Sequence, residues 1–182
     1  MQDLTFIKVA KFFLENPYKE FYLREIAKKL KLSPFAINKY CNILIKERLI
    51  IEIRKANLRY FTPNLSSLFY KQLKIALNIK NIQNSGVLES LQQNVPNISS
   101  IVLYGSMAKG ENDEKSDIDL LIIGKESKVM RKFSDLLHGS IQYSFFSWSE
   151  WNKKAKEDNP FYFEVISYGI VLFGELPVVR WK

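Results

Sequence analysis

The first sixty residues place hydrophobic side chains at helical spacing and then continue into two short β-like runs. Three segments have an apolar face with the helical repeat: residues 3–15, 21–30 and 34–48. Ser33 is a good helix N-cap and Pro34 suits the first helical position, so the third segment begins there. Residues 49–54 and 58–62 flank a short polar turn. We therefore predict three helices and a β-hairpin, with Cys41 buried as a small core residue.

The pattern changes after residue 64. Residues 65–79 and 87–94 predict two helices, and the polar stretch 78–86 predicts a break between them. Beyond Pro96, apolar runs alternate with polar loops and amphipathic segments, which is typical of a β-sheet flanked by helices. We expect strands at 101–104, 117–123 and 141–148, helices at 125–138 and 148–158, and a closing helix and strand within 159–174.

Composition excludes several classes of protein. Of the 182 residues, 47% are hydrophobic, which suffices for a core and excludes wholesale disorder. No run of 18 apolar residues is present, so we expect no membrane span, and the lysine-interrupted N-terminus does not resemble a signal peptide. A single Cys and a single His exclude an internal disulfide and a zinc site built on Cys and His clusters. We expect a cytoplasmic protein.

Charge is concentrated at the N-terminal end. The whole chain carries +8, and residues 1–60 alone hold 13 basic and 6 acidic side chains, a net of +7. Residues 96–182 hold 11 basic and 12 acidic side chains. Such asymmetry favours a polyanion-binding module joined to a second module of different function. A solvated lysine-rich surface is the alternative.

Three helices followed by a basic hairpin resemble the winged helix-turn-helix family of DNA-binding domains, whose helix after the turn enters the major groove. The matching residues are LREIAKKLKLSPFAINKYCNILIKERLI and RKANLRYFTPN. The resemblance implies that the third helix faces DNA through Phe35, Ala36, Asn38, Lys39 and Asn42, and that the wing holds phosphates through Arg54, Lys55 and Arg59. Lys39 suits phosphate or guanine, and Asn38 or Asn42 suits adenine. A protein-docking module or a homodimerisation module is the alternative.

The second half contains a glycine-serine turn and a pair of aspartates. Gly105-Ser106 follows a short apolar strand, and Asp117 and Asp119 lie on one face of the next predicted strand. Two neighbouring carboxylates are costly without a cation, and their oxygens suit Mg²⁺. Gly105 admits a phosphate to the backbone, Ser106 offers a hydroxyl, and Lys109 neutralises phosphate charge. The pattern predicts a metal-triphosphate site, with a plain surface turn as the alternative.

This stretch, GSMAKG followed by DID, resembles the minimal nucleotidyltransferase family of the DNA polymerase β superfamily. The resemblance covers residues 83–174 and implies an NTP substrate, with ATP favoured, and Mg²⁺ as cofactor. Lys109 stands where that family usually has arginine. We therefore expect an α+β protein of two domains: a winged helix at 1–63, a connector helix at 64–82, and at 83–182 a nucleotidyltransferase-like mixed β-sheet flanked by helices.

One family feature is absent. Polymerase β-like enzymes carry a third carboxylate on the following strand, and Gln142 aligns with it here. Glutamine coordinates a metal only through a neutral oxygen and cannot act as a base. Three functions stay open: a nucleotidyltransferase, a DNA-binding regulator that binds nucleotide without turnover, and an antitoxin-like protein that acts on a small helical toxin.

Overall fold

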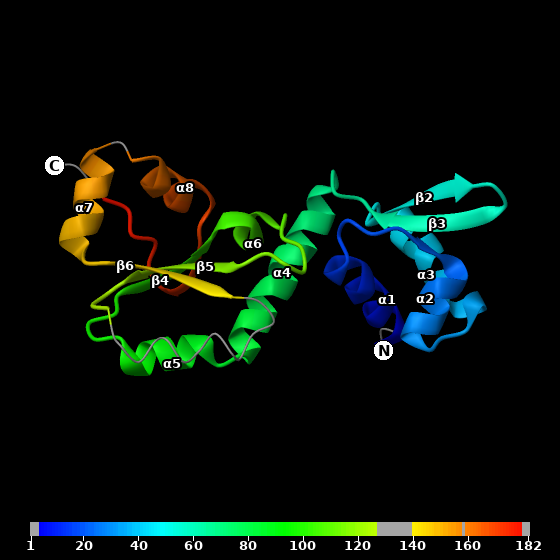
Figure 1. Ribbon diagram of the computed structural model, residues 1–182, viewed down its shortest axis with the longest axis horizontal. Coiled ribbons are helices and arrows are strands. Elements are labelled where there is room, and N and C mark those ends of the chain that lie inside the picture. Colours follow the sequence, from blue (N-terminus) through cyan, green and yellow to red (C-terminus); the bar gives the residue numbers. More distant parts are fainter. Residues whose placement is uncertain (1–3, 127–139, 158, 180–182) are drawn as a thin grey trace. The chain divides into compact units, whose positions relative to one another are not determined.

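The computed structural model describes residues 4–126, 140–157 and 159–179, which form two compact units, Met1–Lys74 and Ile75–Lys182 (Figure 1). Within these residues, no helix combines the length and apolar character that spanning a membrane requires. The mixed α+β class predicted from the sequence is confirmed, with several helices and two separate sheets. The helix predicted at 125–138 lies largely outside the described residues.

The first unit contains three helices and a three-stranded sheet of order β1-β3-β2. Its elements are α1 (Leu4–Glu15), β1 (Phe21–Tyr22), α2 (Leu23–Leu30), α3 (Pro34–Lys46), β2 (Ile50–Lys55) and β3 (Leu58–Pro63). The Ser33 hydroxyl accepts the Ala36 backbone N–H at 3.1 Å, so the predicted cap begins α3. Cys41 is fully buried, as expected, and burial raises the pKa of its thiol to about 12.

The start of the second helix was predicted wrongly. Residues 21 and 22 form the short strand β1, which pairs antiparallel with β3 through Phe21 opposite Phe61 and Tyr22 opposite Tyr60. The aromatic side chains favour this pairing, since a pleated surface accommodates their bulk better than a helix does. Phe21 and Phe61 are both buried there.

The predicted break at residues 78–86 was also largely wrong. Helix α4 runs from Leu68 to Asn84, and only Ser85 and Gly86 interrupt the chain before α5 (Val87–Asn94). One polar residue of this stretch, Asn78, is buried in the second unit beside its hydrogen-bond partner Asn112. Tertiary contacts therefore override the local polarity that suggested a loop.

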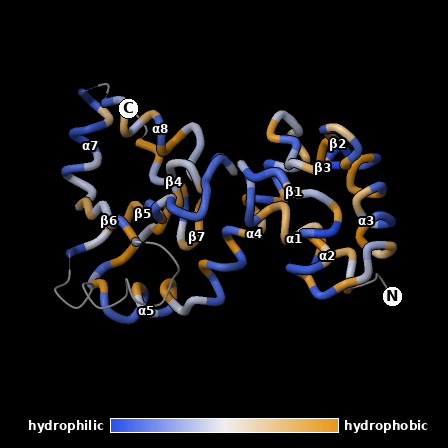
Figure 2. The backbone as a smooth tube through the Cα atoms, turned by 45° about the vertical axis from the view of Figure 1, so that its right-hand side comes forward, coloured by the Kyte–Doolittle hydropathy of each residue, from blue (hydrophilic) through white to orange (hydrophobic). Residues whose placement is uncertain are grey.

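The second unit is built on a mixed sheet of order β6-β5-β4-β7. Its strands are β4 (Ser100–Tyr104), β5 (Ile118–Ile123), β6 (Ile141–Phe146) and β7 (Ile170–Gly174), and its remaining helices are α6 (Gly105–Lys109), α7 (Trp148–Lys156) and α8 (Pro160–Tyr168). Strand β4 pairs antiparallel with β5 and β7, whereas β5 and β6 are parallel. The two central strands are strongly hydrophobic (Figure 2).

Helices cover both faces of this sheet. Ile82 of α4 and the apolar side of α5 pack with Leu103, Leu120 and Ile122 on one face. On the other face, Trp151 of α7 and Val165 of α8 pack with Leu121. The candidate site lies where these strands end, next to the start of β5.

Candidate functional site

The glycine-serine turn lies directly against an aspartate. Strand β4 ends at Tyr104, and Gly105 begins α6 with a φ of +71°, a conformation that favours glycine. A Cβ at Gly105 would lie 2.3 Å from Oδ2 of Asp119. Tyr104 is the register partner of Asp119 across the β4–β5 ladder. The ladder thus brings together two parts of the predicted site that are fourteen positions apart in sequence.

The two predicted aspartates are electrostatic neighbours at the start of β5. Asp117 precedes the strand, and its Oδ1 accepts a hydrogen bond from the Ser140 hydroxyl. Burial raises the pKa of Asp119, and the charges of Asp117 and Glu164 add to that effect. A carboxylate in this position gains from a nearby cation, because the cation offsets both the burial and the repulsion.

Strand β6 contributes an amide and a hydroxyl beside these acids. Its register sets Gln142 opposite Asp119, and residues 141–146 include no Asp or Glu. The Tyr104 and Ser144 hydroxyls share a hydrogen bond at 3.0 Å. Burial raises the pKa of Tyr104, and the nearby Asp119 charge acts in the same direction. The edge of the sheet next to Asp119 therefore offers neutral groups in place of a third acid.

Lys109, predicted to meet phosphate, is paired with a residue that sequence reasoning missed. Its Nζ lies 2.7 Å from Oε1 of Glu164 on α8, and 5.1 Å from the centre of the Tyr168 ring. The Glu164 hydrogen bond raises the pKa of Lys109, so the amine stays charged at neutral pH. No local motif marks Glu164, since only the packing of α8 against α6 brings it there.

A second missed feature anchors the loop between the two motifs. The Asn78 amide donates to Oδ1 of Asn112 at 2.7 Å and to the Met107 carbonyl at 3.0 Å. Both asparagines are at most 5% exposed, so these bonds replace water for buried amides. They tie α4 to α6 and to the loop that leads to Asp117.

The donor set for a metal is small. Among the residues that the structure describes, no group of three or more His, Cys, Asp or Glu side chains is arranged to hold a metal ion. Asp117 and Asp119 therefore offer two carboxylates, and a cation there needs further oxygens, such as those of water or of a bound phosphate. Mg²⁺ is commonly bound in this way, through one or two carboxylates with substrate phosphates.

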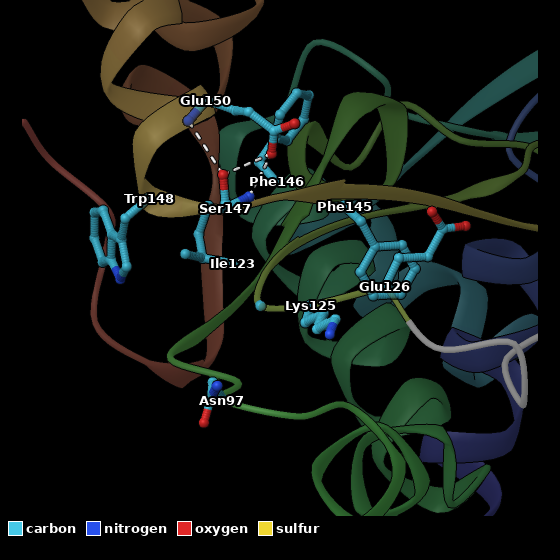
Figure 3. A pocket seen from close by; sticks show the side chains of 10 residues that line it. Asn97, Ile123, Lys125, Glu126, Phe145, Phe146, Ser147, Trp148 and Glu150 are labelled. Carbon is cyan, nitrogen blue, oxygen red and sulfur yellow. Dashed lines mark hydrogen bonds between the residues drawn. The ribbon is translucent and has the colours of Figure 1, made fainter.

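A separate pocket of about 500 Å³ lies at the other end of strands β5 and β6 (Figure 3). It is lined by Ile123 at the end of β5, by Phe145 and Phe146 at the end of β6, and by the capping pair Ser147 and Glu150 of α7. Ile123 lies four positions after Asp119 along the strand, a distance of about 13 Å in extended backbone. This pocket and the aspartate pair are therefore distinct features.

In the first unit, three of the residues predicted to face DNA hydrogen-bond within one network. Arg59 donates through Nη1 to Oδ1 of Asn38 and through Nη2 to Oδ1 of Asn42, the latter at 3.0 Å. The same Nη2 donates to Oε2 of Glu52 at 2.6 Å. Hydrogen bonding to Arg59 is the main cause that lowers the pKa of Glu52. These hydrogen bonds of the guanidinium link the β2–β3 hairpin to α3.

The other residues predicted to contact DNA lie on α3 and β2. Phe35 is 81% exposed at the start of α3, and Lys39 extends over the Tyr40 ring with its Nζ 5.3 Å from the ring centre. Ala36 is partly exposed in the first turn. The remaining wing cations have acidic partners, because Arg54 pairs with Glu52 and Lys55 pairs with Glu20.

Comparison with known proteins finds a family match within the second unit. Residues 84–161 match the family model described as "Nucleotidyltransferase domain". This range includes the Gly105 turn, both aspartates and Gln142. A Methanocaldococcus jannaschii protein named "Putative protein adenylyltransferase MJ0141" is 34% identical over 47 residues, or 26% of this chain. The chain spans about half of that relative, since the match covers 48% of its length.

Two solved structures show weaker likeness. NolR from Sinorhizobium fredii is 20% identical with a TM-score of 0.33, covering 41% of this chain and 79% of that one. A structure described as "Crystal structure of the toxin-antitoxin with AMP-PNP" is 20% identical with a TM-score of 0.37, covering 50% of this chain and 73% of that one. At TM-scores below 0.5, neither likeness assigns a function.

Proposed function

The chain contains a nucleotidyltransferase domain, and we propose that this domain binds ATP with Mg²⁺ and transfers the adenylyl group to a hydroxyl of a protein. The observation that carries the proposal is the close approach of Gly105 to the Asp119 carboxylate. A backbone turn without a side chain lies beside an acid that a cation would stabilise. ATP and a protein acceptor are supported by the name of the Methanocaldococcus relative.

In this proposal Asp117 and Asp119 hold Mg²⁺, and Gly105, Ser106 and Lys109 hold the triphosphate. The donor set fits, because two carboxylates and phosphate oxygens satisfy a hard cation. When bound, Mg²⁺ offsets the negative charge of the phosphate oxygens and of the two acids. Lys109 adds a fixed positive charge, and its bond to Glu164 limits its motion.

Transfer forms a bond between the acceptor oxygen and the α-phosphorus, breaks the bond to pyrophosphate, and releases the acceptor proton. Gln142 cannot take that proton, because a side-chain amide is not a base at neutral pH. We propose that water accepts it, so turnover by the chain alone is slow while nucleotide binding is intact. Nucleotide binding is therefore the property to test first.

The test is calorimetric titration of the full chain with ATP, with and without Mg²⁺. We expect measurable binding only with Mg²⁺, and loss of the metal dependence in Asp119→Ala. Asp113→Ala is the matched control, since Asp113 bonds to its own loop at Lys115 and Ser116. Equal affinity with and without Mg²⁺ would contradict the proposal.

We further propose that residues 4–63 form a winged helix-turn-helix domain that binds duplex DNA. The net charge of +7 over residues 1–60 supports this proposal, as do the three-helix and hairpin order and the exposure of Phe35 and Lys39 on α3. A protein-docking role is the alternative. Fluorescence anisotropy of the full chain with duplex DNA at 50 and 200 mM salt distinguishes them.

Binding should weaken steeply with salt, and Arg54→Ala should reduce the slope of log affinity against log salt by about 0.9. Lys80→Ala is the control, because Lys80 is exposed on α4 outside the proposed domain. If the wild-type chain shows no affinity for duplex DNA at low salt, the docking alternative is favoured.

A further inference from the structure

The Arg59 network constrains how two asparagines of α3 can meet a ligand. Asn38 and Asn42 are four residues apart, so both lie on one face of the helix. Each side-chain oxygen accepts a hydrogen bond from the same guanidinium, Asn38 from Nη1 and Asn42 from Nη2. A guanidinium has donors and no acceptor, so only the oxygen of each amide can face it. The two NH₂ groups therefore point away from Arg59.

Among the residues that the structure describes, neither of these NH₂ groups has a hydrogen-bond acceptor in the protein. Asn42 is exposed and Asn38 is partly exposed, so both groups are available to a partner. Each amide oxygen has two lone pairs, and one of them already accepts from Arg59, so α3 presents at these two positions two free donors beside oxygens that lie against a cation. A free asparagine, by contrast, presents a donor and an acceptor side by side.

The guanidinium itself is held from three directions, so the constraint is built into the fold. Glu52 of β2 accepts from Nη2 of Arg59 at 2.6 Å and is itself bonded to Nε of Arg54 at 3.2 Å. The Phe61 ring lies 5.2 Å below the guanidinium carbon. The Arg59 Nε atom is buried, so the surrounding packing leaves the head group little freedom to turn.

We propose that Arg59 is a positioning residue that turns the NH₂ groups of Asn38 and Asn42 outward and sets a positive charge beside their oxygens, so that α3 selects guanine over adenine in duplex DNA. The inference rests on the proposed DNA-binding function and deepens it by naming the preferred base edge. It also replaces the expectation from sequence that these asparagines pair with adenine.

The chemistry of the major groove gives the direction of the preference. Bidentate pairing of asparagine with adenine needs a donor toward N7 and an acceptor for the N6 amino group. The oxygen that would accept from the adenine amino group already accepts from Arg59, and the positive guanidinium repels a second donor. Guanine shows two adjacent acceptors, N7 and O6, and both suit an NH₂ group. Cytosine presents an amino group and is disfavoured for the same reason as adenine.

The first experiment uses the wild-type full chain. A randomised duplex library is selected for binding, and affinities are then measured for the selected duplex and for base analogues at the preferred positions. We expect guanine at one or two positions, and a loss of about tenfold when adenine or 7-deazaguanine replaces it. Inosine keeps N7 and O6 and should bind within about twofold of guanine.

The second experiment uses variants of the network. Asn38→Ala and Asn42→Ala should each lose the discrimination between guanine and adenine at one position while retaining non-specific binding. Arg59→Met keeps the aliphatic stem and frees both amide oxygens, so its selected sites should shift from guanine toward adenine. Asn81→Ala, an exposed position on α4, is the matched control and should select the wild-type site.

The outcomes separate the two levels of the proposal. Duplex binding with no base preference, or with a preference for adenine in the wild-type chain, would overturn the role of Arg59. A folded Arg59→Met variant that still selects guanine would also overturn it, and if that variant does not fold, the analogue measurements on wild type decide. Absence of any duplex binding at low salt would overturn the DNA-binding function, and the inference with it.

Discussion

Gly105 has to satisfy two constraints, one of the backbone and one of space. Its φ is +71°, and a Cβ would lie 2.3 Å from Asp119 Oδ2. Gly86 offers a matched comparison, because its φ is +74° and nothing lies within 4 Å of a Cβ there. The difference between Ala substitutions at the two positions isolates the contact with the carboxylate.

We expect Gly86→Ala to cost about 1 kcal/mol of unfolding free energy, as for an ordinary residue in this conformation. Gly105→Ala should cost more, about 2–4 kcal/mol, since Asp119 must also move. It should also abolish binding of ATP with Mg²⁺, which Gly86→Ala should leave unchanged. Denaturant unfolding and calorimetry measure both effects; equal behaviour of the two variants would contradict the site geometry.

Asp119 and Asp113 have pKa shifts of opposite sign, which gives a paired prediction for stability against pH. The pKa of Asp119 is raised, so its ionised form disfavours folding, and that loss sets in as pH rises through the raised pKa. The pKa of Asp113 is lowered by the Lys115 backbone N–H and the Ser116 hydroxyl. Its contribution is present above the unfolded value of about 3.9 and is lost as pH falls.

At pH 7 without divalent ions, Asp119→Asn should therefore raise the melting temperature and Asp113→Asn should lower it. Added Mg²⁺ should stabilise the wild type and leave Asp119→Asn unaffected. Both differences from wild type should shrink as pH falls, that of Asp119→Asn as pH drops through the raised pKa of Asp119 and that of Asp113→Asn at lower pH, through the lowered pKa of Asp113. Thermal melts between pH 3 and 8 test this; a lower melting temperature for Asp119→Asn at pH 7 would be the contrary result.

Gln142 leads to a prediction about turnover. Its register position beside Asp119 means that Gln142→Asp places a carboxylate next to the proposed site. We expect adenylyl transfer to rise by about 10²–10⁴-fold, the range typical of general base catalysis. Gln142→Asn is the control, because it shortens the side chain without adding a base. Transfer from α-labelled ATP measures the rate, and an unchanged rate in Gln142→Asp would mean that the base comes from elsewhere.

At the scale of elements, α4 closes the C-terminal end of α1. The Lys74 amine donates to the Leu14 carbonyl at 2.6 Å, and the Tyr70 hydroxyl donates to the Phe13 carbonyl at 3.1 Å. The last carbonyls of a helix have no partner within the helix. The Phe13 carbonyl also accepts from the Asn16 backbone N–H at 3.3 Å, whereas Lys74 supplies the hydrogen bond to the Leu14 carbonyl. Lys74 is 4% exposed, which makes the bond hard for water to replace.

Lys74→Met keeps the apolar stem and removes the donor. We expect it to lower the free energy of unfolding by about 1–3 kcal/mol, the cost of an unsatisfied buried acceptor. Lys80→Met changes the same charge at an exposed position of α4 and should alter stability by less than about 0.5 kcal/mol. Denaturant unfolding of both variants tests the bond, and similar stabilities would argue against it.

The whole molecule has two compact units, and each proposed ligand belongs to one of them. Anything that binds only the folded state stabilises it, by about 2.7 kcal/mol at a ligand concentration of 100 Kd. Hydrogen exchange should therefore slow around β4, α6 and β5 when ATP and Mg²⁺ are added. Duplex DNA should slow exchange in α3 and in the β2–β3 hairpin instead. Protection of α3 and the hairpin by ATP with Mg²⁺ alone would contradict this division.

Local sequence patterns determined most helices and strands, and they located the Gly105 turn and the aspartate pair of the candidate site. The helical repeat, the Ser33 cap and the alternating strands depend on neighbours within a few residues, so they were predictable. The match of residues 84–161 confirms the nucleotidyltransferase domain predicted for the second half of the chain. The turn at Gly105 and the aspartate pair were predicted for the same reason, because each is a contiguous motif.

Only the tertiary structure decided which groups surround those motifs. Glu164 reaches Lys109 from 55 positions away, Asn78 reaches Asn112 from 34, and Arg59 reaches Asn38 from 21. Such contacts leave no trace in a local pattern, since they depend on strand register and on how helices pack. The same long-range partners kept α4 helical through residues that look like a loop. The role of a buried polar group depends on its hydrogen-bond partner, and the tertiary structure determines which partner that is.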